Sequence, residues 1–214
     1  MVRKPFLKVR RLELVPTWGV TLNDNMIRHV AANAQLNYYL TDVLGIGVEV
    51  QRFWYETLDT YFLVGAQDRR SPTLNRYNYS ASLNFHYAPI YAKVAVLDNR
   101  IIHWEGYFTA GVGMTETQVI PRDPAVSVLG DWKNTLITPS VGFSLRIFLS
   151  RWLTVHLGIR DYVFVDRYED KNRERSETLE QSMKNADHLL VNHVMFQAGI
   201  SLWYPTSFQY TTFR

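Results

Sequence analysis

The stretch His193–Tyr204, HVMFQAGISLWY, has the alternation of a β-strand that separates two different environments. Its even positions are all apolar or aromatic, and its odd positions are polar or small apart from Met195 and Trp203. The period of two runs over about a dozen residues, longer than most strands of soluble proteins. A tilted strand needs ~9–11 residues to cross the hydrocarbon of a bilayer. Taken alone, the stretch fits a membrane strand and one strand of a soluble sandwich equally well.

Seven further segments alternate in the same way, which predicts eight strands in all. These segments are residues 11–22, 28–40, 46–56, 77–88, 103–115, 136–149 and 152–164. At 214 residues, without a stretch that resembles an interdomain linker, the chain is expected to form one domain. We therefore predict an antiparallel β-barrel over residues 11–204, with residues 1–10 and residues 205–214 as terminal segments outside it.

The predicted connections alternate between short and long. Residues 23–27, 41–45 and 150–151 are short turns, and residues 89–102 form an intermediate connection with a predicted helical turn over 91–96. The long polar connections are residues 57–76, 116–134 and 165–192, and the last of these is expected to be partly helical after Ser176. Outer-membrane barrels have this asymmetry, with compact periplasmic turns and longer external loops. Both terminal segments are then periplasmic.

The direction of the two faces separates a membrane barrel from a soluble one. In a lipocalin-like carrier the apolar face points inward around a ligand, whereas in an outer-membrane barrel it points outward to lipid. Here the polar face carries ionisable side chains in several strands, together with glycines that leave room for them. On the apolar face, aromatic residues collect near strand ends, as in interfacial girdles: Tyr38, Tyr77, Tyr87, Trp104 and Tyr204. The alternation blurs over residues 52–55, which indicates a bulge or the bilayer rim. The predicted fold class is all-β, an eight-stranded antiparallel up-and-down transmembrane β-barrel.

The composition excludes several classes of function. The chain has no Cys, which rules out disulfides, thiol catalysis and Cys-ligated zinc. The net charge of +3 is not gathered on one face, so nucleic acid is not an expected partner. No apolar run reaches the ~18–20 residues of a transmembrane helix, and the mean hydropathy of −0.17 is compatible with alternating barrel strands. Residues 1–8 contain no apolar core of a signal peptide, so we expect an export signal to have been removed from this chain.

Several short motifs resemble one known family across nearly the whole chain. They are Arg11-x-Glu13-Leu14-x-Pro16, Thr21-Leu22-Asn23-Asp24 followed by Arg28-His29, Pro89-Ile90-Tyr91-x-Lys93 before His103, Thr109-Ala110-Gly111-x-Gly113, and Arg160-Asp161. The chain resembles the outer-membrane β-barrel domain family of myxobacteria and related deltaproteobacteria, which are small OmpA-like barrels. The resemblance implies a bacterial outer-membrane location and the barrel architecture. It also implies an envelope or gliding-motility association, although a fold does not fix a function.

The last strand also resembles the C-terminal targeting strand of outer-membrane barrels. Its polar-x-Gly-apolar-x-apolar-x-aromatic pattern runs through Gln197, Gly199, Ile200, Leu202 and Tyr204. We expect these residues to form the insertion signal that the barrel-assembly machinery recognises. Ten residues follow Tyr204, so recognition either tolerates this tail or uses Phe213 instead.

Charged residues on the polar face predict an ion-pair cluster in the lumen. Glu13, Glu49 and Glu105 are expected at a similar depth with Arg146, while Arg160 and His156 lie above them and Arg11 is the second available cation. Buried carboxylates need such partners because an unpaired buried charge is costly. The cluster is either a structural plug, which we favour, or a polar gate.

The sequence predicts no catalytic, cofactor or metal site. The six His residues are scattered, and neither GxSxG nor HExxH is present. The expected function is a structural or assembly component of a cell-envelope complex. A narrow channel for ions or small solutes and a soluble lipocalin-like carrier are the alternatives. Expected partners are outer-membrane lipid or lipopolysaccharide, the barrel-assembly machinery, and envelope proteins that bind the long loops or the tail.

Overall fold

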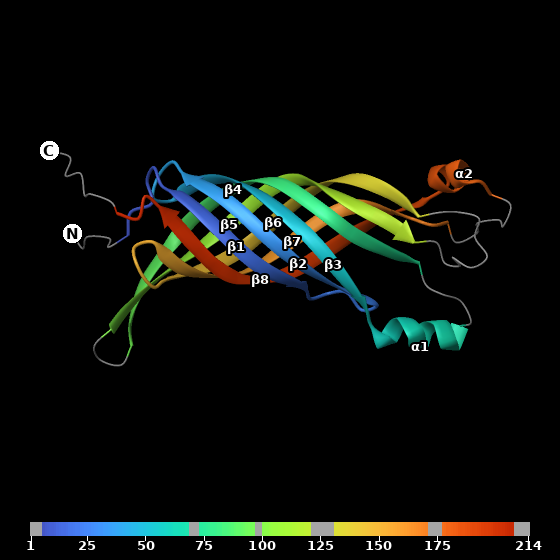
Figure 1. The fold of residues 1–214 in the computed structure, drawn as a ribbon, viewed down its shortest axis with the longest axis horizontal. Coiled ribbons are helices and arrows are strands. Elements are labelled where there is room, and N and C mark those ends of the chain that lie inside the picture. Colours follow the sequence, from blue (N-terminus) through green and yellow to red (C-terminus); the bar gives the residue numbers. More distant parts are fainter. Residues whose placement is uncertain (1–5, 69–72, 97–99, 121–130, 171–176, 208–214) are drawn as a thin grey trace.

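The computed structural model describes residues 6–68, 73–96, 100–120, 131–170 and 177–207. Eight strands form one closed ring in chain order, and each strand pairs antiparallel with its neighbours (Figure 1). The strands are β1 Leu12–Thr21, β2 Ile27–Tyr39, β3 Leu44–Thr57, β4 Leu74–Val96, β5 Arg100–Ile120, β6 Trp132–Phe148, β7 Leu153–Tyr168 and β8 Asp187–Tyr204. The helices are α1 Asp59–Asp68 and α2 Leu179–Lys184. The predicted eight-stranded up-and-down barrel is confirmed.

The first and last strands close the ring. Their register joins Leu12 to Tyr204, Leu14 to Leu202 and Trp18 to Ala198. The stretch His193–Tyr204 therefore forms the C-terminal part of the closing strand. Closure removes the open sheet edges that would otherwise leave backbone N–H and C=O groups without partners.

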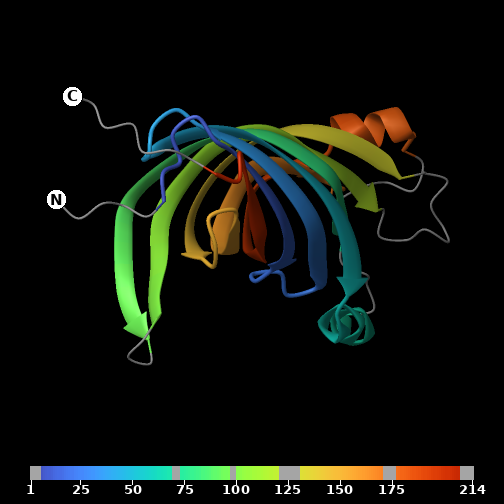
Figure 2. The ribbon, with the colours of Figure 1, turned by 60° about the vertical axis from the view of Figure 1, so that its left-hand side comes forward.

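The two ends of the barrel differ. At one end, here called the terminal end, lie the start of β1, the end of β8 and the turns over 40–43 and 149–152, while α1 and α2 lie at the opposite, helical end (Figure 1). The β4–β5 hairpin continues beyond the terminal end and bends away from it (Figure 2). Its strand pairing runs from Ile90–Gly106 to Val96–Arg100. The predicted helical turn over 91–96 is therefore wrong. A register shift between Tyr87 and Ile90, beside Pro89, hides the continuing strand in the sequence, because proline has no N–H to donate to the ladder.

Of the two alternatives for residues 52–55, the bulge is wrong, and the bilayer rim stays a prediction. The β2–β3 register is unbroken there, from Ala32–Arg52 to His29–Tyr55. A register shift does occur toward the helical end, between Tyr77 and Tyr79 on β4. It reverses the phase of the strand, so Tyr77 points into the barrel at 5% exposure whereas Tyr79 is 52% exposed. Tyr77 thus does not belong to the outer aromatic girdle in which the sequence placed it.

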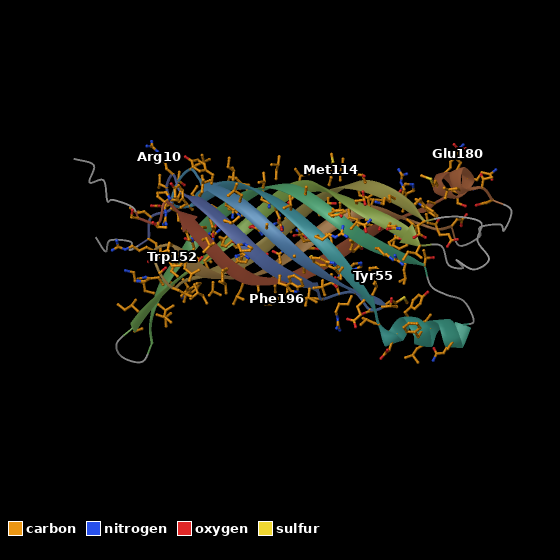
Figure 3. The ribbon with its side chains drawn as sticks, in the orientation of Figure 1. Arg10, Tyr55, Met114, Trp152, Glu180 and Phe196 are labelled. Atoms are coloured by element: carbon orange, nitrogen blue, oxygen red, sulfur yellow. The ribbon has the colours of Figure 1, made fainter. Side chains whose placement is uncertain are left out.

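The burial pattern is inside-out compared with a soluble protein. Exposed apolar side chains surround the ring, including Leu83, Val112 and Ile137, whereas Glu13 and Arg146 are completely buried in the lumen. Met114 and Phe196 point outward from the barrel wall (Figure 3). Tyr38, Tyr87 and Tyr204 are exposed on the outer surface as predicted, and Trp104 is half-buried. Trp18 stacks on Trp54 on the outer surface, with ring centroids 5.6 Å apart.

The helical end contains more regular structure than the sequence predicted. The loop over 57–76 contains α1, which was not expected, while α2 confirms the helix after Ser176. A capping box formed by Thr178 and Gln181 starts α2. β5, β6, β7 and β8 extend into the predicted loops over 116–134 and 165–192, and residues 69–72, 121–130 and 171–176 of the three loops lie outside the described residues. Neither described helix is long and apolar enough to cross a membrane.

Candidate functional site

The lumen near the terminal end holds a network of buried ion pairs, here called the terminal network. It consists of Lys8, Glu13, Tyr39, Glu105 and Arg146. Arg146 Nε donates to Glu13 Oε1 and Arg146 Nη2 donates to Glu13 Oε2, both at 2.8 Å. Arg146 Nη1 donates to Glu105 Oε1 at 2.9 Å, and Tyr39 Oη donates to Glu13 Oε2 at 2.8 Å. One guanidinium therefore joins carboxylates from β1 and β5, in the bidentate geometry that makes such pairs strong.

Lys8 supplies the second positive charge of the terminal network. Its Nζ lies 2.6 Å from Glu105 Oε2, and its side chain is 4% exposed. Burial lowers the pKa of Lys8 to about 8, and attraction to Glu105 offsets this effect only in part. Two carboxylates and two cations thus balance in charge. The segment over residues 1–10, predicted as periplasmic and separate, contributes Lys8 to the interior.

Aromatic rings enclose the guanidinium of Arg146. Its Cζ lies 3.7 Å from the ring centroid of Tyr107, 5.2 Å from that of Tyr39 and 5.6 Å from that of Trp203. Cation–π contacts of this kind are most favourable where water is excluded. Tyr39, Phe148 and Trp203 form an apolar cluster at this end, against which Phe6 packs. Aromatic side chains therefore pack around the terminal network at the terminal end.

A second network, the central network, surrounds Glu49 further along the lumen. It comprises Glu49, Gln51, Asn84, Arg160 and Tyr162. Arg160 Nη1 forms an ion pair with Glu49 Oε2, which also accepts from Asn84 Nδ2 at 2.9 Å. The other carboxylate oxygen accepts from Gln51 Nε2 at 2.6 Å and from Tyr162 Oη at 3.2 Å. The charge of Glu49 is therefore balanced by one cation and its oxygens are saturated with hydrogen bonds.

Two glycines make room for Arg160. A Cβ at Gly111 would overlap Asn84 Oδ1 and lie 3.0 Å from Arg160 Nη2. A Cβ at Gly142 would lie 3.1 Å from Arg160 Cγ. The long side chain of Arg160 can cross the lumen because the facing strands carry no side chain at these positions. This agrees with the expectation that polar-face glycines accommodate charged residues.

Two buried histidines lie beside these networks. His86 Nε2 lies 3.0 Å from Asn37 Oδ1, and Asn37 in turn donates to Glu13 Oε2 at 3.1 Å. His156 Nδ1 lies 3.0 Å from Tyr107 Oη. His156, which was expected above the carboxylates together with Arg160, is thus in hydrogen-bond contact with a tyrosine.

The structure divides the predicted cluster in two. Glu13, Glu105 and Arg146 come together as expected, but Glu49 lies with Arg160 rather than with Arg146. Arg11, the predicted second cation, donates to the backbone carbonyls of Pro205 at 3.1 Å and Arg151 at 2.8 Å. It thereby ties the start of β1 to the end of β8. Lys8 was missed because it precedes the alternating segment that the sequence marks as strand.

A further buried carboxylate, Asp166, was assigned to a loop by the sequence. It lies on β7 near the helical end and is fully buried. Its oxygens accept from Asn75 Nδ2 at 2.7 Å and Thr117 Oγ1 at 3.0 Å. The alternation that continues past Phe164 in the structure is the signal that could have found it.

The residues of the predicted insertion signal lie on β8, and their side chains occupy both faces of that strand. Ile200 and Tyr204 are exposed on the outer surface, at 44% and 71%. Gln197 points into the lumen, where its Nε2 donates to Tyr162 Oη at 3.1 Å. A Cβ at Gly199 would overlap the backbone oxygen of Pro16 on β1. The role of this strand as a recognition signal remains a prediction.

The similarity of the chain to known proteins lies in its fold. No protein-family model and no curated protein sequence matches the chain, so the resemblance to the myxobacterial family remains an expectation. The N-terminal β-barrel domain of OprF from Pseudomonas aeruginosa matches in structure with a TM-score of 0.53 at 10% identity, over 92% of this chain and 98% of that one. Neisserial surface protein A matches with a TM-score of 0.48 at 11% identity, over 90% and 95%. The outer membrane protein OprG from Pseudomonas aeruginosa matches with a TM-score of 0.46 at 10% identity, over 93% and 98%.

Proposed function

We propose that this chain is a bacterial outer-membrane β-barrel with a closed lumen, serving as a structural or assembly component of the cell envelope. The observation that carries the proposal is the inside-out burial, with apolar side chains exposed around the ring and ion pairs buried inside it. A monomeric soluble protein rarely exposes an apolar surface of this extent, whereas lipid is a suitable solvent for it. The terminal end then faces the periplasm and the helical end faces the cell exterior.

The buried networks favour a plug over a channel. An eight-stranded barrel leaves an interior just wide enough for side chains. Here the guanidinium groups of Arg146 and Arg160 lie across that interior and are held by carboxylates from other strands. Opening a path would separate buried charges, and breaking such a pair costs roughly 3–5 kcal/mol. The networks therefore stabilise a closed lumen.

The charged side chains buried in the interior argue against a lipocalin-like carrier. Such a carrier encloses its ligand within an apolar interior. In this barrel the largest completely buried side chains include Arg11, Arg146, Glu13 and Glu49. The interior is thus polar and filled.

An arginine placed on the apolar surface tests the membrane assignment. Val112 is 53% exposed and pairs with Leu83 and Pro139 on the neighbouring strands. In lipid vesicles, Val112→Arg should destabilise the barrel by about 2–4 kcal/mol, as charged residues do near the bilayer midplane. Met183→Arg on α2, outside the barrel wall, is the matched control and should change stability by less than about 0.5 kcal/mol. If both variants behave alike, Val112 does not face lipid.

Planar-bilayer recordings test the plug. The wild-type protein should not conduct, and Arg146→Met should lower stability without producing conductance. If Arg146→Met raises conductance, Arg146 acts as a gate and the narrow-channel alternative is correct.

The structural role also predicts a protein partner at the helical end. α1 exposes Phe62 and Leu63, at 62% and 60%, beyond the barrel wall. We propose this helix, together with the rest of residues 57–76, as one contact surface. A photo-crosslinking residue at position 63, used in intact outer membranes, should capture an envelope protein, whereas the same residue at Val112 should capture lipid.

A further inference from the structure

Barrel closure brings two histidines that are far apart in the sequence to one aspartate near the helical end. Asp24 lies in the turn between β1 and β2, His29 lies on β2, and His193 lies on β8. Asn23 fixes the turn against β8: its Nδ2 donates to the backbone oxygen of Asn192 at 2.6 Å, and its Oδ1 accepts from the backbone N–H of Val194 at 3.0 Å. The three side chains are therefore positioned by backbone contacts on both sides of the β1–β8 junction.

The distances among the three side chains suit a shared metal ion. Asp24 Oδ2 lies 3.0 Å from His29 Nδ1 and 4.0 Å from His193 Nε2. Each residue offers one ligand atom within 4.8 Å of the others. Zinc–nitrogen and zinc–oxygen bonds of about 2.0–2.2 Å in a tetrahedral site separate neighbouring ligand atoms by about 3.3–3.5 Å. The observed separations bracket this value, so small side-chain rotations would complete the geometry.

The hydrogen bonding of His193 is a second, independent indication. Among the residues that the structure describes, its Nε2 is buried and has no hydrogen-bond partner, and the residue is only 2% exposed. This atom faces the Asp24 carboxylate at 4.0 Å, which is too long for a hydrogen bond. A buried nitrogen without a partner costs free energy, because it has given up its hydrogen bonds to water. A metal ion between His193 and Asp24 would remove that cost.

The surroundings hold the ligands in place and leave one side accessible. The ring of His193 packs against Tyr77 and Phe53, with centroid distances of 4.7 and 6.1 Å, and Tyr77 also packs on His29 at 4.3 Å. These aromatic side chains limit the movement of the two imidazoles. The side chain of Asp24 is 21% exposed, which gives access from solvent.

We infer that Asp24, His29 and His193 form a binding site for one divalent transition-metal ion, best matched to Zn²⁺. Two imidazoles and one carboxylate suit Zn²⁺, whereas Ca²⁺ requires 6–8 oxygen ligands and Mg²⁺ also prefers oxygen. A fourth position remains for water on the accessible side. The bound ion links the β1–β2 turn to β8 and so fastens the first strand to the last. This site departs from the sequence-based expectation that the chain has no metal site.

Calorimetric titration of ZnCl₂ into the chelator-treated full chain in detergent micelles tests the inference. We expect one Zn²⁺ per chain and a higher thermal unfolding temperature with the ion than without it. Loss of an outer-shell partner typically weakens a metal site by about 10–100-fold, so loss of a ligand should weaken binding at least tenfold. His193→Gln, His29→Gln and Asp24→Asn should each show this loss together with the loss of the thermal shift.

The matched control is His188→Gln, which removes an exposed histidine of the same strand. It should bind Zn²⁺ as the wild type does. Asp24 lies in a turn, and Asp24→Asn leaves the packing of Tyr77 and Phe53 on the imidazoles intact. This variant therefore tests the ligand set even if the histidine variants fold poorly. Absence of stoichiometric binding, equal affinity in Asp24→Asn, or preferential binding of Ca²⁺ would overturn the assignment.

Discussion

The guanidinium of Arg146 on β6 donates two hydrogen bonds of 2.8 Å to the carboxylate of Glu13 on β1, a residue 133 positions away in the sequence. β1 and β6 are not neighbours in the ring, so this pair spans the lumen. The pair is completely buried, and Glu105 on β5 shares the same guanidinium at 2.9 Å. An internal brace of this kind connects strands that no backbone ladder joins.

Removal of Arg146 should be the most damaging single change in the terminal network. Arg146→Met removes the guanidinium that pairs with Glu13 in a buried site, and we expect a loss of about 3–5 kcal/mol of unfolding free energy. Lys133→Met breaks an exposed pair with Glu116, in which Lys133 is 61% exposed, and should cost less than about 1 kcal/mol. Urea unfolding in lipid vesicles measures both. Similar losses in the two variants would show that the lumenal pair does not brace the barrel.

The two partners should also be energetically coupled. Glu13→Gln combined with Arg146→Met should destabilise the barrel less than the sum of the single changes, because the double variant leaves no unpaired charge between these positions. The expected coupling is about 0.5–3 kcal/mol from a double-mutant cycle. Strict additivity would mean that Glu13 and Arg146 act independently.

The space beside Arg160 gives a prediction for Gly111. Gly111→Ala places a methyl group against Asn84 and Arg160, and such overpacking should cost about 1–3 kcal/mol. Gly65→Ala in α1 is the control, since a Cβ there meets no atom within 4 Å. Alanine also suits a helix better than glycine by about 0.5–1 kcal/mol, so this variant should lose no stability. Unfolding midpoints of the two variants provide the comparison, and an unchanged midpoint for Gly111→Ala would contradict the close packing.

The burial of Lys8 predicts that the free energy of unfolding depends on pH in the alkaline range. Burial disfavours the charged form and lowers the pKa of Lys8 from its ordinary value of 10.5 to about 8 in the barrel. Between these two pH values the unfolded chain binds more protons than the folded chain, so the contribution of Lys8 to stability rises with pH. The unfolding free energy of the wild type relative to Lys8→Met should therefore increase from pH 8 to pH 10.5. A constant difference across this window would show that Lys8 keeps its ordinary pKa.

Truncation tests the position of the insertion signal. A chain that ends at Ser207 retains Pro205, whose carbonyl accepts from Arg11, and removes Phe213. If residues Gln197–Tyr204 are the signal, this chain should insert into the outer membrane as the full chain does. Tyr204→Ala should reduce insertion, as measured by the fraction of folded protein in washed membranes. Loss of insertion on truncation alone would assign the signal to the tail.

The number of strands and the direction of their faces could be predicted from the sequence. A strand has a side-chain period of two, so the chain order of polar and apolar residues decides which side chains share a face. Leu12–Thr21 and His193–Tyr204 show this alternation without any knowledge of their partners. Local alternation failed where proline or a bulge shifted the phase, as at Pro89 and Tyr77.

The partners inside the barrel were decided by the tertiary structure alone. The sequence identifies Glu13, Glu49 and Glu105 as lumenal, but ring closure and strand register determine which cation reaches each carboxylate. Lys8 reaches Glu105 from a turn before β1, in which the Lys8 carbonyl accepts from the Arg11 N–H. Arg160 reaches Glu49 because Gly111 and Gly142 leave room for it. In the same way, Asp24, His29 and His193 meet only because the last strand pairs with the first. Face polarity is a local property of the chain, whereas contact across a lumen depends on the closed geometry of all eight strands.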